Sequence, residues 1–231
     1  MKTQELYQKL KVDNPYLTLN VDDYQLDLQG WNSFHENFYN MLEKYRPSLV
    51  VEVGSWKGGS AVSMAKAVKA LELDCHIICV DTWLGSIEHR RSDEYKAWLN
   101  DKHGYPQIFY QFAANIMKQG LQDIVVPFPQ HSLIAAQWFR EQKIVPDLVY
   151  IDASHEVEPV FADVTEWYNT VAYNGALFGD DVYCPEVALA LNLFTRVNGI
   201  AHSKVDAIQW LIKKDQNESA KRILEILLQS Q

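Results

Sequence analysis

The sequence is poor in cysteine and has no arrangement of cysteines that could build a disulfide framework or a zinc site. It contains three of them, Cys75, Cys79 and Cys184, which is an odd number without CxxC spacing. Small disulfide-rich domains and zinc modules both need paired cysteines at short spacing. We therefore expect reduced thiols that are buried in the fold.

Positive charge and long apolar runs are also scarce. The 21 Lys and Arg residues against 30 Asp and Glu residues give a formal net charge of -9. Binding to nucleic acid depends on clustered Lys and Arg, so this balance argues against a DNA or RNA partner. No apolar run approaches the roughly 20 residues of a membrane-spanning helix, and residues 1–10 lack the layout of a signal peptide. We expect a cytoplasmic protein with no membrane span.

The chain does contain enough apolar material for one large core. Its 231 residues are 48% hydrophobic, which is typical of a folded domain. Helical spacing of apolar residues over 31–45 predicts a helix, and we interpret residues 1–47 as a helical cap on a core domain of residues 48–231. Apolar faces on this cap, or on a last helix expected over 218–228, could form a homo-oligomer, although a monomer could bury them equally well.

From residue 48 onward, short β-rich runs alternate with helical stretches. This alternation indicates βαβ units, and it predicts a Rossmann-like α/β fold. We expect a doubly wound, mostly parallel, seven-stranded sheet with helices on both faces, in which residues 204–213 supply the antiparallel edge. The expected strands are 48–53, 76–80, 124–127, 148–151 and 176–178, and the expected helices are 60–71, 108–119, 133–142, 157–171 and 185–197.

One connection is much longer than the others. Residues 82–110 separate the second expected strand from its helix, whereas βα loops usually have two to six residues. The segment carries Trp83, Tyr95, Trp98 and Tyr105. Long loops of this kind often act as lids or binding loops. We interpret it as a lid-like insertion, and an ordinary surface insertion is the alternative.

The clearest local motif is VVEVGSWKGGS at residues 50–60, an apolar strand that runs into a glycine turn and a helix. Glycine allows a tight turn, and the unpaired N–H groups of the following helix can face an anionic or carboxylate-bearing ligand. The pattern is ExGxxxG. It is not the dinucleotide fingerprint GxGxxG, because Trp56 stands where a glycine is needed, and it is not a P-loop, because Gly59 and not a Lys directly precedes Ser60. A purely structural turn is the alternative.

Acidic residues follow three of the expected strands. Asp81 closes the run 76–80, at a place where a carboxylate can accept hydrogen bonds from ribose hydroxyls. Asp152 follows the fourth strand and Asp180 and Asp181 follow the fifth, so all should meet at the carboxyl edge of the sheet. Clustered carboxylates suit Mg²⁺ or Mn²⁺. The alternative is that they end strands and cap helices.

His155 is the histidine that lies beside these acidic strand ends. An imidazole with a pKa near neutrality is a suitable proton acceptor at such a place. The alternative is that His155 opens the helix that follows it.

Four ordered segments together resemble a known family. VVEVGSWKGGS, VDTWLGS, DLVYIDASHEVEPVFADVTEWY and GALFGDD are similar to the class I S-adenosylmethionine-dependent methyltransferases, over residues 48 to about 213. Within that superfamily the sequence most resembles bacterial O-methyltransferases of small molecules and of sugars, including macrolide-sugar and polysaccharide enzymes. It departs from the family at Asn174 and Gly175, where a Pro-Gly-Gly turn is usual.

The resemblance implies roles for individual residues. Asp81 would hold the ribose with Trp83 nearby, and Ser132 would meet the adenine. The strand-end carboxylates would hold a metal ion, and His155, with Asp152, would be catalytic. The implied cofactor-binding residues are Glu52, Gly54, Ser55, Gly58, Ser60, Asp81, Trp83, Ser132 and Asp152, and the implied metal ligands are Asp152, Asp180 and Asp181.

The resemblance therefore implies S-adenosylmethionine-dependent O-methylation of a hydroxyl on a sugar or another small molecule, assisted by Mg²⁺ or Mn²⁺. One alternative is a noncatalytic subunit of a biosynthetic complex that binds an adenosyl ligand. A second alternative, an enzyme that uses a nicotinamide cofactor, is disfavoured by the missing GxGxxG motif.

Overall fold

The computed structural model describes residues 2–30 and 33–215, and in that part of the chain seven strands form one sheet. Their order is β3-β2-β1-β4-β5-β7-β6, which confirms the predicted doubly wound, mostly parallel sheet. The strands are β1 (Leu49–Val53), β2 (His76–Asp81), β3 (Val125–Pro129), β4 (Leu148–Ile151), β5 (Ala176–Gly179), β6 (Ser203–Lys204) and β7 (Trp210–Lys213).

The register brings the carboxyl ends of the central strands to one edge. β1 pairs in parallel with β2 and β4, and β5 extends the parallel part. β7 pairs antiparallel with β5 and carries β6 at the rim, as expected for residues 204–213. The reversal of strand order at β1 and β4 is the place where α/β sheets bind ligands.

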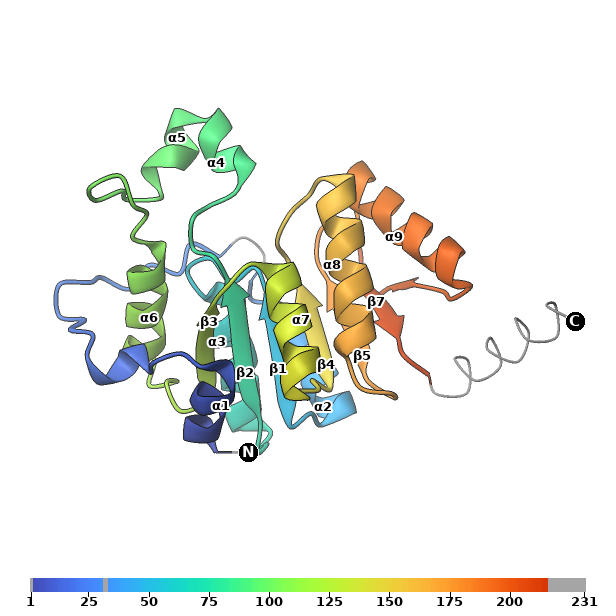
Figure 1. The fold of residues 1–231 in the computed structure, drawn as a ribbon, viewed down its shortest axis with the longest axis horizontal. Helices are drawn as coiled ribbons and strands as arrows, with labels where there is room; N and C mark the ends of the chain where they lie inside the picture. The colour runs from blue at the N-terminus through green and yellow to red at the C-terminus, as the bar shows by residue number, and fades with distance from the viewer. Residues whose placement is uncertain (1, 31–32, 216–231) are drawn as a thin grey trace, which may run out of the picture.

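Helices cover both faces of this sheet (Figure 1). One face carries α1, α7, α8 and α9, and the other carries α2, α3 and α6. The crossover helices lie within two residues of their predicted bounds. The helices are α1 (Thr3–Leu10), α2 (Glu36–Tyr45), α3 (Gly59–Ala70), α4 (Ile87–Arg91), α5 (Asp93–Ala97), α6 (Ile108–Lys118), α7 (Ser132–Gln142), α8 (Val157–Thr170) and α9 (Pro185–Asn198), with a 3₁₀ turn, η1 (Pro15–Leu17).

Burial explains why the five parallel strands were readable from the sequence. β1, β4 and β5 are buried along their whole length because helices cover both faces of the sheet. Cys75 and Cys79 are buried free thiols, whereas Cys184 is half-buried. None of the helices in residues 2–30 and 33–215 is both long and apolar enough to cross a bilayer.

The N-terminal segment differs from the expected single cap helix. α2 begins at Glu36, after the N-cap residue His35, and not at residue 31. A second helix, α1, packs on the opposite face of the sheet through Leu6, Tyr7 and Leu10. The N-terminal segment thus covers both faces. The helix expected over 218–228 lies outside the described residues.

The insertion at 82–110 contains two short helices that stand above the carboxyl ends of the strands (Figure 1). These helices, α4 and α5, bury none of their residues. The insertion is anchored at its base, because Leu99 is fully buried and the Gln107 N–H donates to the Leu99 carbonyl. It therefore stands over the edge of the sheet on a fixed base.

Candidate functional site

The glycine turn after β1 is shaped by a close approach of two strand ends. Gly54 has φ +85°, and its N–H donates to the carbonyl of Val80. A Cβ at this position would lie 2.1 Å from the carbonyl oxygen of Asp152. Only glycine fits here, and it lets the turn that leads into α3 pass directly against the end of β4.

Asp81 holds this turn in place. One carboxylate oxygen accepts hydrogen bonds from the Ser55 and Trp56 N–H groups, both at 2.9 Å, and the other accepts from the Trp83 N–H at 2.7 Å. Burial raises the pKa of Asp81, while these backbone donors lower it in part. A carboxylate offers about four acceptor sites. Together with the Thr82 N–H, these donors use all four sites, so a ribose hydroxyl would have to share an Asp81 oxygen with a backbone donor or replace one.

Glu52 points into the core between β1 and α3. It is fully buried, and its two oxygens accept hydrogen bonds from Ser60 Oγ and Cys79 Sγ. Burial raises its pKa, and these two hydrogen bonds lower it in part. Ser55, in the same turn, is also buried. Buried polar side chains therefore lie directly beneath the turn.

Trp83 lies under the turn, and its side chain is only 2% exposed. Its indole N–H donates to the Trp56 carbonyl at 2.8 Å, and its ring contacts those of Phe109 and Phe112. Gly58, at the N-cap of α3, faces the same Phe112 ring, which a Cβ would meet at 3.0 Å. These aromatic contacts fix the floor of the expected cofactor site.

Ser132 begins α7 beyond β3, and its hydroxyl is engaged with α8. It donates to Asp163 at 2.6 Å and accepts from the Trp167 indole at 2.8 Å. Burial raises the pKa of Asp163 to about 6. The residue expected to meet adenine thus also ties two helices together.

The strand-end carboxylates meet as predicted at the ends of β4 and β5. The Tyr150 hydroxyl lies 3.3 Å from an Asp152 oxygen and 3.4 Å from an Asp180 oxygen. Burial, followed by the charges of Asp180 and Asp181, raises the pKa of Asp152 to about 8. Burial also raises the pKa of Asp180 to about 6. These acidic groups repel one another in the absence of a cation.

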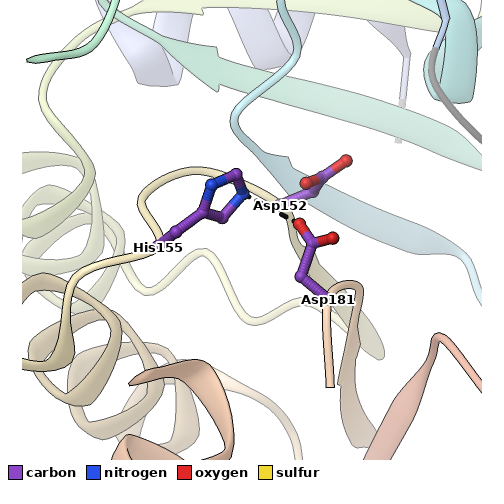
Figure 2. A group of neighbouring side chains, drawn as sticks. All are labelled: Asp152, His155 and Asp181. Carbon is purple, nitrogen blue, oxygen red and sulfur yellow. Dashed lines mark ion pairs between the residues drawn. The ribbon is translucent and has the colours of Figure 1, made fainter. Parts of the chain in front are cut away.

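His155 pairs with Asp181 in this group (Figure 2), and it also pairs with Glu88 of the insertion. Its Nε2 lies 2.8 Å from Asp181, and its Nδ1 lies 3.1 Å from Glu88 in α4. The hydrogen bond to Asp181 is the main reason that the pKa of His155 rises to about 9. Burial alone would raise the pKa of Asp181, but the hydrogen bond with His155 helps to lower it. His155 therefore carries a positive charge at neutral pH in this arrangement.

The candidate metal ligands lie close together, but the set differs from the one expected. Asp152, His155 and Asp181 each offer a ligand atom, and these atoms lie within 4.8 Å of one another. Asp180 turns one oxygen toward Tyr150 and accepts the Asp181 N–H with the other. Hard carboxylate oxygens that repel one another in a half-buried pocket fit Mg²⁺ or Mn²⁺, and an imidazole suits Mn²⁺ better.

A set of polar contacts beside the glycine turn, made by Lys57, Asp27 and Asn115, was not predicted from the sequence. Lys57 is buried and pairs with Asp27 at 2.7 Å. The fully buried amide of Asn115 donates to the carbonyls of both Asp27 and Lys57, and it accepts the Asp27 N–H. These contacts join segments distant in sequence and fix the N-terminal segment against the turn.

Comparison with known proteins agrees with this arrangement. A family model described as a methyltransferase domain matches residues 51–182. No curated protein sequence matches the chain at a significant level.

Solved structures show the same fold at low sequence identity. The O-methyltransferase NovP superposes with a TM-score of 0.57 and 17% identity, covering 78% of this chain and 79% of its own. An O-methyltransferase from Bacillus cereus in complex with SAH gives 0.56 and 13%, covering 93% and 92%. TomG from Streptomyces achromogenes, an O-methyltransferase of tomaymycin synthesis in complex with SAM, gives 0.56 and 10%, covering 91% and 86%.

The strand order, the glycine turn and the family match lead to one conclusion. The family model covers more than half of the 231 residues and contains the glycine turn and the ends of β2, β4 and β5. The resemblance to class I methyltransferases is therefore confirmed for family and fold, and the protein belongs to the methyltransferase domain family.

Proposed function

We propose that the protein transfers a methyl group from S-adenosylmethionine to a hydroxyl of a sugar or another small molecule. The observation that carries this proposal is the contact between the glycine turn and the strand-end carboxylates. Gly54, in the glycine turn, lies directly against the Asp152 backbone, and Asp152 belongs to the carboxylate group. A ligand at the turn would therefore reach the strand-end carboxylates. The O-methyltransferases of similar fold support the choice of acceptor atom.

The glycine turn before α3 is the proposed cofactor site. The N–H groups of a helix N-terminus can meet a carboxylate, and Asp81, at the end of β2, stands where a carboxylate would accept a ribose hydroxyl. Glu52 and Ser60 lie behind the turn, and Trp83 supports it from below. Ser132 is the first residue of α7, after β3, and is the residue expected to meet the adenine.

The chemistry needs a methyl donor and a proton acceptor. S-adenosylmethionine, when bound, supplies an electrophilic methyl group on a sulfonium. The C–S bond breaks with its electron pair remaining on sulfur, while a C–O bond forms to the acceptor. The chain must hold the two reactants in line, which can lower the barrier by roughly 7–11 kcal/mol, and it must take up the hydroxyl proton.

Asp152 is the proposed proton acceptor in the arrangement described. Burial and neighbouring charges raise its pKa to about 8, so Asp152 is mostly protonated at neutral pH and accepts a proton in its ionised form, which predominates above about pH 8. His155 holds its proton between Asp181 and Glu88, so it becomes a base only after Asp181 has gained another partner. Until then, His155 positions α4 over the site.

A divalent cation fits the carboxylate group. Asp152 and Asp181 would hold it, and His155 would join them after losing its proton, whereas Asp180 accepts from the Tyr150 hydroxyl and the Asp181 N–H. Such an ion would lower the pKa of an acceptor hydroxyl that approaches it.

The insertion is the proposed cover for the acceptor. Its aromatic side chains extend from the glycine turn: the ring centroids of Trp56, in the turn, and His89, in the insertion, are 4.5 Å apart. Within the insertion, Tyr95 stacks on Trp98 at 4.5 Å. The contact between Glu88 and His155 ties the same insertion to the carboxylate group. Aromatic faces of this kind suit the apolar faces of a sugar or a planar ring.

The test is the release of S-adenosylhomocysteine from S-adenosylmethionine over a panel of sugar nucleotides, glycosides and phenols. We expect turnover with Mg²⁺ on at least one acceptor and a decrease of about 100-fold or more with EDTA, because the cation activates the hydroxyl. Equal turnover with EDTA would remove the metal from the proposal. Cofactor binding without turnover on any acceptor would favour the alternative, a noncatalytic adenosyl-binding subunit.

A further inference from the structure

Gln209 is a fully buried polar residue without a hydrogen-bond partner in the described part of the chain. Its side chain has no exposed surface, and neither its amide oxygen nor its amide nitrogen makes a hydrogen bond there. A buried amide that lacks partners destabilises a fold. Native proteins retain such groups rarely, and a ligand that completes their hydrogen bonds is one reason to retain them.

Gln209 lies beside the carboxylate group. Trp210 pairs with Gly179, so the preceding residue, Gln209, lies at the level of Asp180. Side chains alternate along a strand, which places Gln209 on the same face as Leu211. That face is the α2 face, where Leu211 and the ring of Tyr150 belong to one cluster. The unpartnered amide is therefore assigned to the α2 face at the level of Asp180, whose carboxylate accepts the Tyr150 hydroxyl.

The backbone around Gln209 is held independently of its side chain. One oxygen of Asp206 accepts the N–H groups of Ile208 and Gln209, both at 2.7 Å, and the other accepts the amide of Asn37 at 2.5 Å. The Gln209 carbonyl accepts the Val205 N–H. The loop is thus fixed to α2 without any contribution from the Gln209 amide.

His35 brings a second unpartnered atom to the same place. It is the N-cap residue of α2, and its Nδ1 lies 3.9 Å from Asp206. Its Nε2 is buried and has no partner among residues 2–30 and 33–215. His35 is also close enough to Asp180 to lower the pKa of that carboxyl in part, against the larger effect of burial.

We propose that the Gln209 amide and the Nε2 atom of His35 bind and select the methyl acceptor. An amide both donates and accepts hydrogen bonds, which matches a hydroxyl group. The carboxylates of Asp152, Asp180 and Asp181 would repel an anionic group at this place, so the part of the acceptor that enters is neutral and hydroxylated, such as a sugar ring. This inference rests on the proposed function.

The first test needs no acceptor and uses the variant Gln209→Met, which keeps the side-chain length and removes both polar atoms. If the amide is retained for a ligand, the ligand-free variant is more stable, with Tm raised by about 3 °C or more. The matched control is Gln137→Met, which removes an exposed amide in α7 that pairs with Glu141 and should leave Tm unchanged within about 1 °C. A lower Tm for Gln209→Met would show that the amide has a structural partner, and would overturn the proposal.

The second test measures selection. With the best acceptor from the panel above, Gln209→Met should raise the acceptor KM by about 10-fold or more, because each lost hydrogen bond weakens binding. Its Kd for S-adenosylhomocysteine, measured by calorimetry, should stay within about 2-fold of that of the unmodified protein. An unchanged acceptor KM overturns the proposal. Failure of the unmodified protein to bind S-adenosylhomocysteine would instead overturn the proposed function, and the Tm comparison would still decide whether Gln209 is unpartnered.

Discussion

Gly54→Ala is expected to abolish cofactor binding and to destabilise the protein by at least about 3 kcal/mol. The added Cβ would lie 2.1 Å from the Asp152 carbonyl oxygen, and the backbone has φ +85°. The ends of β1 and β4 would have to separate, and the turn held by Asp81 would move with them. Urea denaturation gives the free energy of unfolding, and calorimetric titration with S-adenosylhomocysteine gives the affinity.

Gly120→Ala is the matched control for this variant. Gly120 also has a positive φ of +64°, but no atom lies within 4 Å of the position of its Cβ. We expect a loss of only about 1 kcal/mol, from backbone strain alone, with cofactor affinity unchanged. Equal losses of stability in the two variants would show that the contact between the strand ends is not what requires glycine.

Asp152→Ala is expected to decrease turnover at least about 100-fold while increasing stability by about 1–2 kcal/mol, measured in EDTA. The pKa of Asp152 is raised to about 8, so its protonated form is favoured by folding. The stability it contributes is therefore fully present below its ordinary pKa and is lost as the pH rises through about 8. The gain from Asp152→Ala should accordingly be larger at pH 9 than at pH 5.

Asp147→Ala, just before β4, is the matched control, and it should lower stability while leaving turnover nearly unchanged. One oxygen of Asp147 accepts the Ser48 N–H at 2.7 Å and the Leu49 N–H at 3.1 Å. Loss of these bonds should cost about 1–3 kcal/mol and leave turnover nearly unchanged. A decrease in both turnover and stability for Asp152→Ala would contradict the assignment of Asp152 to the chemistry.

Much of the fold could be predicted because its strands are buried on both faces. Such strands are short, continuous apolar runs, and the helices between them keep their apolar spacing. α1 was missed because it has only eight residues, of which Leu6, Tyr7 and Leu10 are buried. The two helices of the insertion were missed because their burial pattern gives no apolar face.

Only the part of the site that is formed by residues at the ends of strands could be predicted from the sequence. Asp152 and Asp181 were expected to meet because parallel strands end at one edge, and they do so with His155 between Asp181 and α4. The partner Glu88 was not predictable, because it comes from a separate element over the site. The unpartnered amide of Gln209 was equally hidden, since an isolated glutamine carries no sequence pattern. Contacts between distant segments need the three-dimensional structure.

The most direct test of the central claim is calorimetric titration of the unmodified protein with S-adenosylmethionine, with and without Mg²⁺. The account predicts one binding site per chain, with a Kd in the range of roughly 1 μM to 1 mM that is common for small substrates of enzymes. It also predicts competition by S-adenosylhomocysteine. The absence of binding heat under both conditions, confirmed by equilibrium dialysis with labelled cofactor, would contradict the claim that the glycine turn and Asp81 form a cofactor site.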